Sequence, residues 1–241
     1  MGAVINKKPD QNLGRTVVKG FTHGALGGYL IFESKRLVRK FGSEKNYNYI
    51  WPSKIVNAAG SSIIENAAAN RELWERWHLN LGFNHIEVDF KDKFKVSYRI
   101  MPFSLLRTLY LFSKARLDID RSMVFGILVF NQETPEILEE GRSSRGKAYL
   151  NHILLRRGMH QSTEAHEIIH TYQYEGFSGI NTFFDSPMSR LEQKSKLARI
   201  YNKIFYTDFN AVFSMSIYNF EWERKGYWEN YFEKEARFFS Y

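Results

Sequence analysis

The chain contains no cysteine among its 241 residues. This absence excludes disulfide bonds, thiolate metal ligands and cysteine nucleophiles. Zinc can also be bound by the nitrogen of histidine and the oxygen of aspartate or glutamate. We therefore expect any transition-metal site in this protein to be built from histidine and carboxylate side chains.

Long apolar runs are also missing. No stretch reaches the roughly 18 uncharged apolar residues of a spanning helix, so we expect none. The first residues lack the continuous apolar core of a signal peptide, and we expect no such peptide there. Paired-cysteine fingers and a ribonucleoprotein signature are absent too, so no nucleic-acid partner is expected.

Residues 1–80 are predicted to form an N-terminal helical segment that is rich in glycine and basic residues. Gly20, Gly24 and Gly28 recur every four residues, which on a helix makes a smooth strip where another helix can approach. The basic run 35–40 and the net charge of +8 suit anionic partners such as lipid headgroups. We therefore consider a membrane surface or a membrane-protein complex as a partner. A membrane or cell-envelope location is favoured over the cytoplasm, although the compartment itself stays unknown.

Residues 81–157 are predicted to form an antiparallel sheet of five or six strands. Apolar and polar residues alternate from 85 to 100, with the segment 91–93 as the turn of a hairpin. Further strand-like segments follow, at 106–112, 115–120, 124–130 and 148–155. With helices before and after this sheet, the fold class is predicted to be α+β.

Residues 158–241 are predicted to be helical and to hold a metal site, with 81–241 forming one domain. His166, Glu167 and His170 form a His-Glu-x-x-His run. On a helix the two histidines lie one turn apart on the same face, where they can bind one zinc ion (Zn2+). Glu167 can then reach a metal-bound water as general base. The alternative is a packed helix with two hydrogen-bonded histidines.

A catalytic zinc site of this kind needs a third protein ligand. A sheet followed by a His-Glu-x-x-His helix and later helices resembles the zincin metallopeptidases. The metzincin branch is excluded, because no histidine follows His170 at the required short spacing. The segment 233–236 instead resembles the Glu-x-x-Ala pattern of the gluzincins, with Arg237 where that family often has aspartate. The resemblance implies Glu233 as the third ligand, with Glu235 in reserve.

The resemblance also implies a zinc-dependent metallopeptidase that acts on a peptide or protein substrate. In zincins the strand before the metal-binding helix receives an extended peptide, which here would be the strand around 149–155. Tyr149 and Asn151 are then candidate substrate contacts. Gln173 lies on the histidine face, where it can touch substrate or a group that supports the ligands, and the alternative is an ordinary amide on the helix surface. The alternative function is a non-catalytic, membrane-associated or complex-forming subunit with a structural or degenerate histidine helix.

Overall fold

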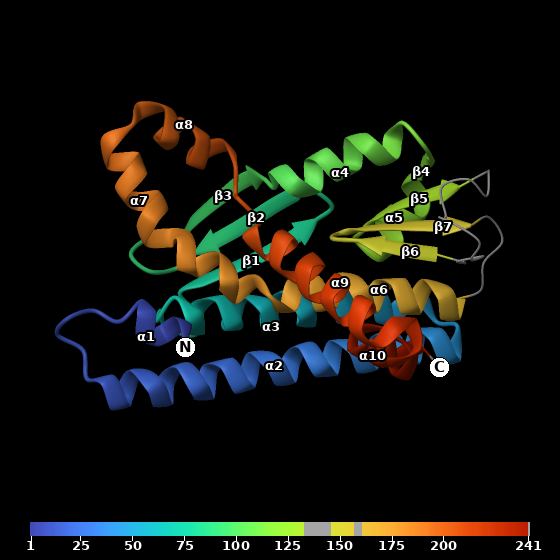
Figure 1. Ribbon diagram of the computed structural model, residues 1–241, viewed down its shortest axis with the longest axis horizontal. Coiled ribbons are helices and arrows are strands. Elements are labelled where there is room, and N and C mark those ends of the chain that lie inside the picture. Colours follow the sequence, from blue (N-terminus) through green and yellow to red (C-terminus); the bar gives the residue numbers. More distant parts are fainter. Residues whose placement is uncertain (133–145, 157–160, 241) are drawn as a thin grey trace.

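The computed structural model describes residues 1–132, 146–156 and 161–240, which form an α+β fold (Figure 1). The predicted fold class is confirmed. The described helices are α1 (Gly2–Ile5), α2 (Leu13–Glu44), α3 (Ile50–Ala68), α4 (Pro102–Phe112), α5 (Ile119–Phe125), α6 (Gln161–Gly176), α7 (Asp185–Lys194), α8 (Lys196–Ile204), α9 (Phe209–Glu229) and α10 (Tyr231–Ser240), with the 3-10 helices η1 (Tyr47–Tyr49) and η3 (Ser178–Phe184). The described strands are β1 (Arg76–Leu81), β2 (Asn84–Asp89), β3 (Lys95–Ile100), β4 (Arg116–Asp118), β5 (Leu128–Gln132), β6 (Gly146–Tyr149) and β7 (His152–Arg156).

Helix α2 runs along one side of the molecule and packs against α3 (Figure 1). The two helices touch where Gly27 faces Gly60, because a Cβ atom on either residue would lie 2.7 Å from the other's carbonyl oxygen. Of the predicted contact strip at every fourth glycine, Gly20 does lie against another helix, since a Cβ atom there would be 2.7 Å from Ala3 Cβ of α1. The prediction is wrong for Gly24 and Gly28, where a Cβ atom would meet nothing within 4 Å. No helix in the described ranges is both long and apolar enough to cross a membrane.

The strands form two sheets instead of the single antiparallel sheet that the sequence predicted. Strands β1, β2 and β3 form an antiparallel sheet, which contains the predicted hairpin between β2 and β3. The second sheet has the order β4-β5-β7-β6, and its central pair, β5 and β7, runs parallel. Alternation shows that one face of a strand is covered, but it does not identify the neighbouring strand.

Two of the predicted strands are helical in whole or in part. Segment 106–112 lies within α4, which has Pro102 in its first turn and buries side chains three and four residues apart. Segment 115–120 is divided between β4 and α5, and the Asp118 carboxylate caps α5 by accepting a hydrogen bond from the Arg121 N–H. Short apolar runs fit a helix or a strand equally well, so packing decides between them.

The last two predicted strands are each interrupted by a residue in the left-handed region. In segment 124–130, Gly126 has a φ of 61° and ends α5 before β5 begins. In segment 148–155, Leu150 has a φ of 56° and separates β6 from β7. What the sequence predicted as one strand is therefore a hairpin.

One hydrophobic core is shared by all three parts into which the sequence divided the chain. Its members are at most 3 % exposed. They include Val38 and Phe41 of α2, Val129 of β5, Ile153 of β7, Ile168 of α6 and Phe239 of α10. Helix α6 thus has helices on one side and the mixed sheet on the other (Figure 1).

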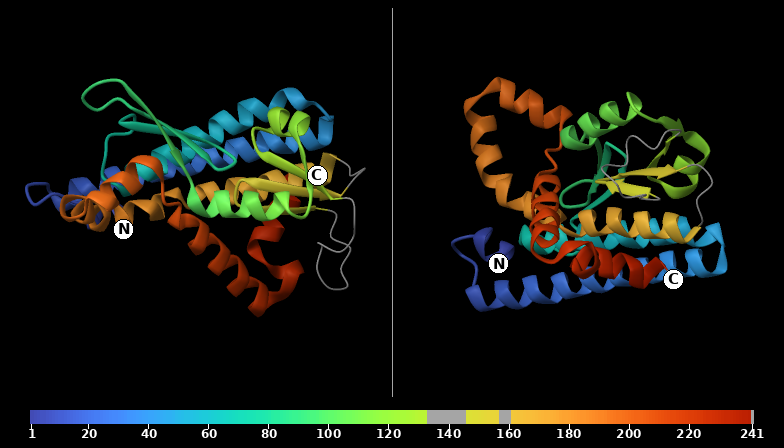
Figure 2. Two further views of the ribbon diagram at one scale, coloured as in Figure 1. Left: turned by 90° about the horizontal axis from the view of Figure 1, so that it is seen from above. Right: turned by 45° about the vertical axis from the view of Figure 1, so that its right-hand side comes forward.

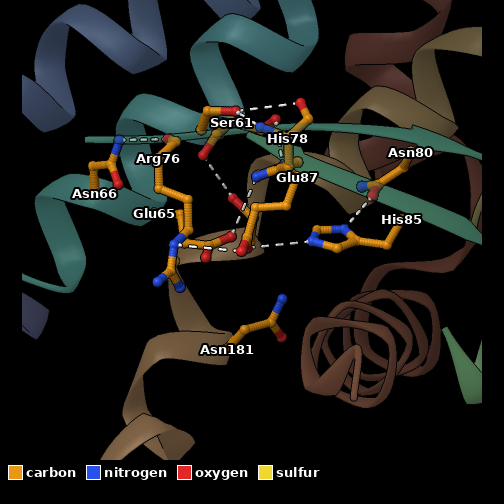
Figure 3. A network of polar contacts seen from close by, with 12 residues as sticks. Ser61, Glu65, Asn66, Arg76, His78, Asn80, His85, Glu87 and Asn181 are labelled. Carbon is orange, nitrogen blue, oxygen red and sulfur yellow. Dashed lines mark hydrogen bonds and ion pairs between the residues drawn. The ribbon is translucent and has the colours of Figure 1, made fainter. Parts of the chain in front are cut away.

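A buried polar network ties the antiparallel sheet to α3 (Figure 3). Glu65 of α3 accepts a hydrogen bond from the Tyr206 hydroxyl at 3.1 Å and lies 3.4 Å from His78 Nδ1 on β1. On β2, His85 Nδ1 lies 2.8 Å from Asn80 Oδ1. Both histidines are therefore held by polar partners inside the fold.

Candidate metal centre

The His-Glu-x-x-His run lies on α6, the helix that the sequence predicted. Ala165, Ile168 and Ile169 are fully buried in the core, which fixes the rotation of the helix about its axis. His166 and His170 project together from another side, where their side chains are 15 % and 14 % exposed. Solvent can therefore reach the histidine pair, as a catalytic metal site requires.

Glu233 reaches the histidines from α10, 67 residues further along the chain. The chain turns before α10 at Gly226, whose φ of 68° lies in the left-handed region. The Asn230 side chain then accepts a hydrogen bond from the Phe232 N–H at 2.9 Å. Ala236, three residues after Glu233, is fully buried, so a small side chain stands where α10 packs against α6.

The donor atoms of the three side chains form a triangle, and all lie within 4.8 Å of one another. His166 Nε2 lies 3.2 Å from His170 Nε2 and 3.2 Å from Glu233 Oε2, and His170 Nε2 lies 3.4 Å from Glu233 Oε1. Ligand atoms on one tetrahedral zinc, each about 2.0–2.1 Å from the metal, lie about 3.3 Å apart. The geometry and the donor types therefore fit a zinc ion. Within the described residues, no other three His, Asp or Glu side chains are grouped as closely.

The charges of the triangle stabilise one another. Burial opposes ionisation of Glu233, but hydrogen bonds from His166 and His170 hold its pKa well below the usual range. Burial also opposes protonation of His170, yet its hydrogen bond to Glu233 and the Glu233 charge raise its pKa to about 9. Without a metal, His170 is therefore protonated at neutral pH and paired with the Glu233 carboxylate. A metal ion would take the place of this proton, which makes the histidine neutral.

Glu167 is buried beside the triangle, with 5 % of the residue exposed. The backbone N–H of Ala148 on β6 donates a hydrogen bond to its carboxylate. Burial raises the pKa of Glu167, although the nearby His170 and His166 oppose this. A Cβ atom on Gly146 would lie 2.9 Å from Glu167 Cγ, so β6 approaches this side chain closely. A fixed carboxylate with a raised pKa is suited to general-base chemistry.

In the order of the described strands, β6 stands last and lies beside the site, whereas the sequence predicted the strand around 149–155 as the edge. Strand β7 is paired with β5 on one side and β6 on the other, so it offers no edge to a peptide. Tyr149 ends β6, and its ring centre lies 3.4 Å from the guanidinium carbon of Arg107. Asn151 is fully buried, which contradicts the predicted contact with substrate.

Gln173 is buried and contacts the candidate ligand His170, so it is not the ordinary surface amide that the sequence left as the alternative. Its Oε1 atom accepts a hydrogen bond from His170 Nδ1 at 2.8 Å, and its Nε2 atom donates to Glu235 Oε2 at 2.8 Å. Glu235, the reserve ligand, therefore points away from the triangle, and it pairs with Lys35 of α2 at 2.8 Å. A hydrogen bond at Nδ1 leaves Nε2 of the neutral imidazole free to bind a metal.

Two tyrosines of α9 approach Glu233, and neither was predicted from the sequence. The Tyr218 hydroxyl donates a hydrogen bond to Glu233 Oε1 at 2.7 Å. Burial and the charge of Glu233 raise the pKa of Tyr227 to about 12. With 14 tyrosines in the chain, nothing in the local sequence distinguishes these two. Only the turn between α9 and α10 brings them to the site.

Comparisons with family models, with curated proteins and with solved structures found no match for this chain. The resemblance to gluzincins therefore rests on the segments 166–170 and 233–236 themselves.

Proposed function

We propose that the protein is a zinc-dependent metallopeptidase of the gluzincin type. The observation that carries this proposal is the convergence of His166, His170 and Glu233 at distances that suit a tetrahedral zinc. If the His-Glu-x-x-His pattern had arisen by chance, we would not expect a carboxylate of α10 to lie beside both histidines. Glu167 follows His166 on the same helix and would be the general base.

The chemistry would be the hydrolysis of a peptide bond. Bound zinc would polarise the peptide carbonyl and lower the pKa of a water molecule. Glu167 would take a proton from this water, whose oxygen forms a bond to the carbonyl carbon. As the C–N bond breaks, Glu167 would return the proton to the leaving nitrogen. One water is consumed, and an amine and a carboxylate are released.

The surroundings of the triangle suggest how ligands and substrate are held. Tyr218 donates to Glu233, and Gln173 accepts from His170, so each of these two ligands has a neighbour that restricts its rotation. An extended peptide or protein segment would lie next to Glu167, on the side of the site where β6 approaches this carboxylate. This arrangement supports a peptide or protein substrate.

The test compares metal content and peptide hydrolysis in three proteins. Wild-type protein should contain one zinc by mass spectrometry, and His166→Ala should lose it because one of three ligands is gone. Glu167→Gln should keep the zinc, while its kcat on a mixed peptide library falls by about 10²–10⁴-fold through loss of the base.

Glu223→Gln, an exposed position on α9, serves as the matched control and should behave as wild type. Wild-type protein without stoichiometric metal would refute the zinc site. Stoichiometric zinc with no hydrolysis of any library peptide, or hydrolysis that Glu167→Gln leaves unchanged, would refute the peptidase.

A further inference from the structure

The outward side of α2 is apolar over about half of the helix. Val17, Val18, Phe21, Tyr29 and Phe32 share this side and are 46 % to 75 % exposed. We refer to these five residues as the outer face of α2. The exposed side of a surface helix is normally polar, because only the side toward the core needs apolar residues.

Small and apolar residues continue this face between the large side chains. Gly24 and Gly28 border open space, so no other part of the described chain covers them. The one Lys or Arg between residues 17 and 32 is Lys19, which pairs with Glu72 at 2.6 Å. The uncovered apolar stretch extends for about 22 Å along the helix, at about 1.5 Å per residue.

Basic residues follow the apolar stretch on the same side of α2. Arg36 and Arg39 lie one and two turns beyond Phe32, and Lys40 is adjacent. Arg36 pairs with Glu33 at 2.9 Å, and the Arg39 guanidinium carbon lies 5.0 Å from the centre of an exposed aromatic ring on α10. The outward side of the helix thus changes from apolar to cationic along its length.

The position of α2 leaves this side open. Figure 1 and the right-hand view of Figure 2 show α2 along one border of the molecule, with the other elements stacked on one side of it. Contacts to α3, α6 and α10 account for its buried side. A flat surface can therefore meet the whole helix at once.

We propose that the outer face of α2 binds the surface of a membrane that contains anionic lipids. The apolar residues would enter the boundary between headgroups and acyl chains, with α2 parallel to the membrane plane. Arg36, Arg39 and Lys40 would meet the negative headgroups. This proposal does not depend on the metal centre.

Charge argues for lipid over a second copy of the chain. If two copies packed through this face in parallel, the basic ends would meet and repel each other. In an antiparallel pair, each basic end would lie on the apolar stretch of the other copy and lose water without a partner. An anionic membrane surface suits both the apolar outer face of α2 and the basic residues that follow it.

The test measures co-sedimentation of the full chain with vesicles. Wild-type protein should bind phosphatidylglycerol-containing vesicles at least about tenfold more tightly than pure phosphatidylcholine vesicles, and high salt should reduce the difference. Phe21→Glu should weaken binding about tenfold or more, because it places a charge in the apolar stretch. Replacing Arg36, Arg39 and Lys40 by glutamine should weaken it about fivefold per cation.

Phe94→Glu is the matched control, because Phe94 is 70 % exposed in the loop between β2 and β3, and Phe21 is 75 % exposed. Circular dichroism and thermal melting would show that each variant is folded. Absence of vesicle binding by the folded wild type would overturn the proposal, as would equal losses in Phe21→Glu and Phe94→Glu. A dimer seen by light scattering that Phe21→Glu dissociates, without vesicle binding, would assign the face to a second copy instead.

Discussion

His170 is connected to the opposite side of the helical layer by a chain of hydrogen bonds. Its Nδ1–H donates to Gln173, Gln173 donates to Glu235, and Glu235 accepts from Lys35 of α2. Lys35 holds the Glu235 carboxylate in place, and this carboxylate sets the orientation of the Gln173 amide. Only the NH₂ group of the amide can donate to a carboxylate. The amide oxygen is therefore left to face His170.

Gln173→Ala is predicted to weaken zinc binding by about 10- to 100-fold, the usual effect of losing a hydrogen-bond partner of a metal ligand. The imidazole of His170 would lose the acceptor that fixes its tautomer and its rotation. Competition with a chromogenic chelator measures the affinity. Gln193→Ala, on α7, is the control and should match wild type. Equal zinc affinity in Gln173→Ala and wild type would contradict the role of this hydrogen bond.

At the scale of elements, the crossing of α2 and α3 depends on a pair of glycines. Gly27 and Gly60 allow the two backbones to meet, whereas Gly28, one position further along, borders open space. The same residue type therefore has opposite consequences at neighbouring positions. At Gly27 the helix contact requires a residue without a side chain. At Gly28 the lack of a side chain serves no contact and only increases the freedom of the backbone.

Gly27→Ala is predicted to lower the free energy of unfolding by about 1–3 kcal/mol, because its methyl group would overlap the α3 backbone. Gly28→Ala should raise it by about 0.5–1 kcal/mol, since alanine is the better helix former and meets no atom there. Urea unfolding followed by circular dichroism measures both. Changes of the same sign in the two variants would contradict the helix contact assigned here.

At the scale of the whole molecule, buried histidines make the stability depend on pH. Burial and the charge of Arg107 lower the pKa of His152 to about 4, although its hydrogen bond to the Tyr149 carbonyl opposes this. The unfolded chain takes up this proton near pH 6.5, the ordinary value. The unfolded state therefore binds more protons between pH 6.5 and 4, and stability is lost as the pH falls through this window.

Between pH 7 and pH 5, the free energy of unfolding is predicted to fall by about 2 kcal/mol more in wild type than in His152→Gln. Urea unfolding at both pH values measures this difference. Thr108→Ala is the matched control, because it removes the partner 2.5 Å from His152 Nε2 but keeps the imidazole. It should be less stable than wild type and keep most of the pH dependence. An unchanged pH dependence in His152→Gln would contradict a buried, neutral His152.

The sequence by itself determined the features that depend on local geometry. The spacing of His166 and His170 places both on one side of any α-helix, because the backbone repeats every 3.6 residues. The alternation from 85 to 100 likewise determined the hairpin of β2 and β3. A short resemblance predicted Glu233 as the third ligand, and the helical geometry indicated that Glu233 and Glu235 cannot both face one metal.

Tertiary structure alone decided the features that depend on residues far apart in the chain. Segment 106–112 is helical, and β7 is a central strand, because of what each packs against. Tyr218 and Lys35 reach the site only through the turn before α10 and the packing of α2. These contacts join segments that are far apart in the chain, and the periodicity of a local sequence cannot predict them. The sequence pattern permits many pairings of helices and strands, and the burial of one shared core decides which of them forms.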